Sequence, residues 1–251
     1  MKKIVFFVII VLVIPVAQDA TATTADIFIK LGKELEKKGE WGKAAEHYKA
    51  IFTINPVSLD QKIEANFRYG RALILMGEQT DGENVFRKLS KLYNQNGNTF
   101  ISKEKRAYVG QARFILNEDA FTKATKPYND ASVPLKRFLA QRENTLVKMK
   151  RGYEQVIAVD SAEWVLASLF RIGLANEITA KTILEAPLPK YLSDKNRDEF
   201  HLTLRNRGLP YEDRAIVMYK KVLALDERQK IGGEWIRLTK IHLNNLLKPS
   251  R

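Results

Sequence analysis

Three stretches of the chain share one pattern and recur at multiples of nearly the same spacing. They read HYKAIFTINP (residues 47–56), RGYEQVIAVDS (151–161) and VMYKKVLALDE (217–227). Each contains a Tyr, then apolar residues at helical spacing, then a polar stop. Tyr48, Tyr153 and Tyr219 are 105 and 66 residues apart, about three and two times a period near 34 residues. Such a period predicts stacked helical hairpins, and therefore an all-α fold.

The clearest unit is ADIFIKLGKELEKKGEWGKAAEHYKAIFTINP (25–56). Gly39 supplies a left-handed turn between two helices, and Asn55 before Pro56 ends the second one. A second unit, IEANFRYGRALILMGEQTDGENVFRKLSKLY (63–93), repeats the pattern, with Gly70 in place of Gly32. A third unit over 103–125 is weaker, with Gly110 as its small residue.

This pattern resembles the tetratricopeptide repeat. The matching positions are Phe28, Leu31, Gly32, Leu35, Ala44, Tyr48 and Pro56, whereas Ile51 stands where the family prefers a small residue. The resemblance implies a superhelix with a concave groove, lined by the first helix of each pair, that binds peptides or protein faces. The residues expected to line this groove are Ile29, Lys33, Lys37, Phe67, Arg71 and Ile74.

The remaining sequence is also predicted to be helical, so that residues 23–127 form the repeats and 128–251 a C-terminal region that continues the solenoid. Asn129 to Pro134 interrupts the array. A heptad stripe then predicts one long helix over 133–159, with Arg142 extending its charged end out of the core. Further helices are expected over 162–184, 193–207, 210–226 and 234–247, with Gly208 and Pro210 separating the second of these from the third.

This region resembles exported repeat proteins of predatory and gliding bacteria, of the gliding-motility complex type. The resemblance rests on AYVGQARFILNEDAF (107–121), the long helix, AEWVLASLFRIG (162–173) and EAPLP (185–189).

The N-terminus predicts export. Lys2 and Lys3 precede an apolar run, and Ala20-Thr21-Ala22 offers a small-residue cleavage site. Residues 1–22 are therefore predicted to be a cleaved signal peptide, leaving a periplasmic protein with no stable membrane span. The alternative is an inner-membrane anchor formed by residues 4–17. The chain has no cysteine, so it needs no disulfide chemistry after export.

The net charge of +13 suits an acidic partner or an anionic polymer, while export argues against nucleic acid. Basic residues collect between 123 and 151, and Arg137, Lys148 and Arg151 fall on nearly one side of the long helix, outside the heptad stripe. They form either a docking patch for a partner or a solvated helix face.

No motif for catalysis, metal binding or cofactor binding is found. His47, His201 and His242 lie far apart, and there is neither a phosphate-binding Gly-rich loop nor a nucleophile motif. The sequence thus favours a non-enzymatic scaffold that joins other proteins or peptides in a bacterial cell-envelope complex, such as a gliding-motility complex. The alternative is a basic periplasmic module that binds cell-wall or lipopolysaccharide polymers and coordinates envelope growth.

Overall fold

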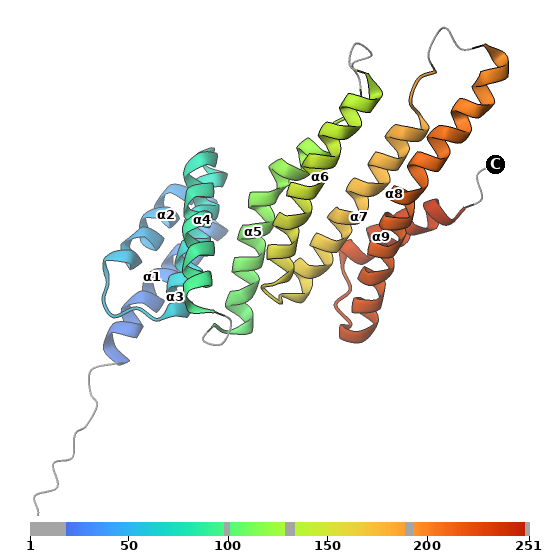
Figure 1. Ribbon diagram of the computed structural model, residues 1–251. Helices are drawn as coiled ribbons and strands as arrows, with labels where there is room; N and C mark the ends of the chain where they lie inside the picture. Colours follow the sequence, from blue (N-terminus) through green and yellow to red (C-terminus); the bar gives the residue numbers. More distant parts are fainter. Residues whose placement is uncertain (1–18, 98–100, 129–133, 189–192, 249–251) are drawn as a thin grey trace, which may run out of the picture.

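The computed structural model describes residues 19–97, 101–128, 134–188 and 193–248, and every regular element in these ranges is a helix (Figure 1). The helices are α1 (Asp19–Lys37), α2 (Trp41–Ala50), α3 (Leu59–Leu75), α4 (Gln79–Asn96), α5 (Lys103–Ala124), α6 (Leu135–Ile157), α7 (Ala162–Leu184), α8 (Asp194–Gln229) and α9 (Glu234–Leu247), with a short 3-10 helix, η1 (Ile51–Thr53), after α2. The predicted signal peptide lies almost wholly outside the described residues.

The helices pair into four hairpins, α1/α2, α3/α4, α5/α6 and α7/α8, followed by the single helix α9. We call α1, α3, α5, α7 and α9 the first helices and the others the second helices. The hairpins stand side by side in chain order, with α1 and α2 at one end and α8 and α9 at the other (Figure 1). This arrangement confirms the predicted all-α, solenoid-like fold of stacked hairpins.

Glycines allow the left-handed backbone of the turns and the close approach of the two helices of a hairpin. Gly39 and Gly77 have φ of 74° and 89°, as the turns after α1 and α3 require. A Cβ on Gly32 would lie 2.4 Å from Cε1 of Tyr48. A Cβ on Gly70 would lie 2.7 Å from Cε1 of Phe86, and a Cβ on Gly173 would lie 2.7 Å from Cε1 of Tyr219. One contact is therefore repeated in three hairpins.

The third hairpin departs from the predicted pattern. Gly110 lies against α7 instead, because the three atoms nearest to a Cβ added to it all belong to Trp164, with Cδ1 at 3.0 Å. Phe114 takes the position that glycine holds elsewhere, and its ring centroid lies 5.4 Å from that of Tyr153. The long helix predicted over 133–159 is α6, the second helix of this hairpin, so the array continues across the predicted interruption.

The prediction of two helices over 193–207 and 210–226 is wrong, because α8 runs unbroken for 36 residues with Pro210 inside it. Proline removes one backbone hydrogen bond and costs about 3 kcal/mol in a helix interior. Packing on both sides of the proline offsets this cost. Leu204 is buried in a cluster with Ile183, and Tyr219 in a cluster with Phe170.

Three of the four hairpins share a polar contact that also reaches the next first helix. A buried Tyr of the second helix donates a hydrogen bond to a Glu of its own first helix, over 2.9, 2.6 and 2.5 Å. A basic or imidazole side chain from the next first helix lies 3.0, 2.6 and 2.9 Å from the same carboxylate. We call these sets junction triads: Glu36–Tyr48–Arg68, Glu118–Tyr153–Arg171 and Glu177–Tyr219–His242.

Burial and the adjacent carboxylate raise the pKa of all three phenols, so each stays a protonated donor. The equivalent positions at the junction of α3/α4 with α5 hold Ile74, Phe86 and Ala112, which belong to one apolar cluster. Phe86 has no hydroxyl to donate, and Ile74 has no carboxylate to accept. At each junction, the three equivalent positions are therefore either all polar or all apolar.

Arg142 is a further correction, since it is 3% exposed and its charged end does not leave the core. Its guanidinium donates to Thr182 Oγ1 and to the carbonyl of Lys126, and lies over the ring of Phe138. It therefore ties α6 to α7 and to the segment after α5, and no acidic partner lies beside it among the residues that the structure describes.

Candidate functional site

A groove of about 550 Å³ runs along the first helices at the α1 end of the array. It is formed by α1, by the start of α3 and by Lys105 of α5. Its size falls within the range of about 300–1,000 Å³ that is usual for ligand sites. Charged groups of both signs line it: Lys30, Lys33, Lys37 and Lys105 with Asp26, Glu34, Asp60 and Glu64.

Glu64 organises the floor of this groove. It is 4% exposed, and its carboxylate lies 2.7 Å from Lys33 Nζ, 2.8 Å from Arg68 Nε and 2.5 Å from Lys105 Nζ. Burial alone would raise the pKa of Glu64, but the hydrogen bonds from Lys105, Lys33 and Arg68 outweigh burial and lower the pKa to about 2. One buried carboxylate thus binds cations from α1, α3 and α5.

Arg68 connects this floor to the first junction triad. Its Nε donates to Glu64, its Nη1 to Glu36 over 3.0 Å, and its Nη2 to the hydroxyl of Tyr108 over 3.1 Å. Because Glu36 also accepts from Tyr48, the groove floor is continuous with the buried contacts between the first two hairpins. The floor is therefore held rigidly, as a binding surface requires.

Three of the six residues predicted to line a groove do so, namely Ile29, Lys33 and Lys37. Ile29 contributes little surface because it is 6% exposed. Lys37 lies on the exposed edge, 2.8 Å from Glu34.

The prediction is wrong for Phe67 and Ile74. Phe67 is buried between the rings of Phe86 and Tyr108, with centroids 5.8 and 4.8 Å away. Ile74 occupies the junction position equivalent to Glu36 and packs against the apolar cluster. Arg71 is exposed and lies outside the groove lining, 3.8 Å from Glu36 and over the ring of Trp41.

The basic patch predicted on the long helix is a separate surface. Arg137, Lys148 and Arg151 are exposed on α6, a second helix, and none has an ion pair within the described part of the chain. The first and the last of them are 14 positions apart, or about 21 Å along the helix axis. Whether this surface binds anything remains a prediction.

Sequence reasoning missed the junction triads and Glu64. A signal for two of the triads was present, because Gly32 and Gly173 each precede a Glu by four residues and face a Tyr. Glu64 had no such signal, since only the fold brings Lys33, Arg68 and Lys105 around it.

The three histidines lie apart from one another. His47 packs against Phe28, His242 lies beside Glu177, and His201 is exposed on α8. Within the ranges that the structure describes, no group of three His, Cys, Asp or Glu residues is placed to hold a metal ion. Among the helices described, none combines the length and apolar character that a bilayer span needs.

Comparison with known proteins assigns no family to this chain, because no protein-family model and no curated protein matches it.

Proposed function

We propose that this protein is a non-enzymatic scaffold, built from helical hairpins of the tetratricopeptide kind, that holds other proteins together. The observation that carries the proposal is the groove along α1, α3 and α5, with its charged lining and its rigid floor on Glu64. The junction triads support it, because they fix the first hairpin to the second, the third to the fourth and the fourth to α9, and so help to keep a long binding surface in one shape.

The groove favours an extended peptide with charges of both signs. Glu64 is already neutralised by three cations, whereas Lys30, Lys37 and Glu34 lie at the exposed edge. Side chains at this edge can give up bound water or a local ion pair and form an ion pair with a partner instead. Such exposed pairs contribute little affinity individually and mainly select the partner.

The proposed place of action is the bacterial periplasm, where the protein would act in a cell-envelope assembly. The N-terminal pattern of residues 1–22 supports export, and the resemblance of the C-terminal half supports a gliding-motility complex as the assembly. We expect a mature N-terminus near Thr23. Intact-mass measurement of the protein from its own cell tests this expectation, and a full-length chain in the membrane fraction would favour the anchor instead.

In-cell photo-crosslinking tests the scaffold. A photoreactive amino acid at Lys30 or Lys37 should capture one partner, and the same group at Lys49 or Lys91 on second helices should not. The captured partner should then bind the purified protein, and the double variant Lys30→Glu/Lys37→Glu should weaken this binding about tenfold. The matched control Lys49→Glu/Lys91→Glu makes the same charge change. Equal binding by both variants would contradict the proposal.

The exposed cations of α6 favour a second candidate, binding to anionic envelope polymers. Arg137, Lys148 and Arg151 have no ion pair to give up among the described residues. Binding through such charges should weaken steeply between low and high salt. The variant with all three changed to Glu should abolish binding to lipopolysaccharide or wall polymer while circular dichroism stays unchanged. Polymer binding that survives the triple change would exclude this candidate.

A further inference from the structure

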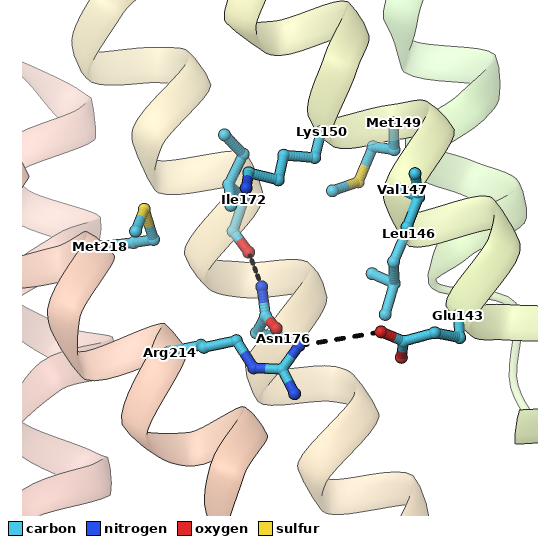
Figure 2. A pocket seen from close by; sticks show the side chains of 9 residues that line it. All are labelled: Glu143, Leu146, Val147, Met149, Lys150, Ile172, Asn176, Arg214 and Met218. Carbon is cyan, nitrogen blue, oxygen red and sulfur yellow. Dashed lines mark hydrogen bonds and ion pairs between the residues drawn. The ribbon is translucent and has the colours of Figure 1, made fainter.

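A second pocket, of about 350 Å³, lies between α6, α7 and α8, away from the groove along the first helices (Figure 2). Its apolar lining comes from all three helices: Leu146, Val147, Met149, Ile172 and Met218. Val147 is 41% exposed, and Val217, next to Met218 on α8, is 47% exposed. Apolar surface is thus presented to solvent both in and beside the pocket.

A buried amide in the pocket has a free acceptor. Asn176 is 8% exposed, and its Nδ2 donates to the carbonyl of Ile172 over 2.8 Å. Its Oδ1 makes no hydrogen bond within the described residues. Figure 2 shows this amide between Ile172 and Arg214. This oxygen can therefore accept a hydrogen bond from a ligand that brings an N–H or O–H group into the pocket.

The lining of the pocket has two basic residues and one acidic residue, although Lys150 also lies 3.6 Å from Glu154 on its own helix. Its charged lining consists of Lys150, Arg214 and Glu143, and Figure 2 shows Glu143 and Arg214 facing each other from α6 and α8, 3.9 Å apart. Glu143 also accepts a hydrogen bond from Tyr211 over 2.5 Å, so its charge is already engaged.

Positive charge continues along α8 beyond the pocket. Basic residues recur there every seven positions, which brings them to one side of the helix: Arg207, Arg214, Lys221 and Arg228. All four are exposed. A ligand that lies along α8 therefore meets basic side chains on both sides of the pocket.

The geometry points to a binding site for an acidic peptide segment with one leucine-sized side chain. This side chain enters the apolar pocket, a backbone N–H donates to Asn176 Oδ1, and flanking carboxylates meet Lys150 and Arg214. An apolar anchor in a pocket with a charged rim is the usual form of a small protein-recognition site. A lipid acyl chain fits the apolar lining but has no donor for Asn176. This site would operate whether or not the groove along the first helices binds a partner.

The methionines make the test direct, because the described residues include only three: Met149 and Met218 in the pocket, and Met76 at the end of α3. The whole chain, labelled with 13C in the methionine methyl groups, is titrated with a capped pentapeptide of one Leu between two pairs of Glu. The methyl signals of Met149 and Met218 should shift saturably, and that of Met76 should stay in place. Replacing the Leu by Ala, or the four Glu by Lys, should weaken binding about tenfold or more.

Variants test whether Lys150 and Arg214 bind the carboxylates of the peptide and whether the pocket holds its apolar side chain. Lys150→Glu/Arg214→Glu should invert the preference, so that the Lys peptide binds better than the Glu peptide. The control Lys49→Glu/Lys91→Glu has the same net charge and should bind like the wild type. Val147→Trp, a change at an exposed position, should block the pocket without affecting folding.

Three results would overturn the inference. The first is that Met149 and Met218 do not shift with the acidic peptide. The second is that the Glu and Lys peptides shift them equally. The third is that only vesicles of phosphatidylglycerol and phosphatidylethanolamine shift them, which would assign the pocket to lipid.

Discussion

Replacing Glu64 by Gln should change how the stability of this protein depends on pH. The three cations around Glu64 lower its pKa from 4.5 to about 2, so folding favours its charged form. Each pKa unit corresponds to about 1.4 kcal/mol, which gives about 3 kcal/mol of stability at neutral pH. Because the folded pKa is the lower one, this contribution is complete above pH 4.5 and is lost as the pH falls through 2. About 2 kcal/mol of it should disappear between pH 6 and pH 3.

Urea unfolding at pH 6 and at pH 3, followed by circular dichroism, measures this difference. The free energy of unfolding of Glu64→Gln should be several kcal/mol below the wild type at pH 6, because the variant leaves partly buried cations without their carboxylate. The gap should narrow by about 2 kcal/mol at pH 3. The control Glu34→Gln removes an exposed carboxylate of the same groove and should follow the wild-type profile. Parallel profiles for Glu64→Gln and the wild type would refute the reasoning.

Three further changes test the packing of the hairpins. Gly32→Leu should lower the free energy of unfolding by about 1–3 kcal/mol or more, because the new side chain collides with the ring of Tyr48; an unchanged melting temperature would contradict the close contact. Tyr219→Phe should cost about 1.5–3 kcal/mol in urea unfolding, since it removes a hydrogen bond to the carboxylate of Glu177; a neutral effect would mean that this bond adds nothing. Pro210→Ala should raise the melting temperature, because it restores a helical hydrogen bond inside α8; a decrease would show that the ring of the proline itself stabilises the helix.

The sequence predicted most of the helices because their limits depend on local signals. The predicted ranges 162–184 and 234–247 coincide with α7 and α9, and the turn glycine Gly39 has the expected left-handed backbone. Helical periodicity, caps and glycine turns act within a few residues, so a single sequence shows them.

Features that depend on tertiary packing could not be predicted from the sequence, because no local signal marks them. Pro210 is a local helix breaker, and only its neighbours' burial against α7 keeps α8 continuous. Phe67 was assigned to an open groove because repeat position does not distinguish an exposed residue from one covered by α5. Glu64 depends on cations 31 residues before it and 41 after it. The groove itself was predicted, but the residues that hold it together were not.

The last helix has a consequence for dividing the chain experimentally. His242 of α9 is the only member of its junction triad that lies outside the α7/α8 hairpin. Ile236 and Leu243 of the same helix are buried in the cluster that holds Phe170 and Tyr219. A fragment that stops after α8 would expose this cluster to water. Recombinant fragments should therefore extend through Leu247, so that α9 continues to cover the cluster of α7 and α8.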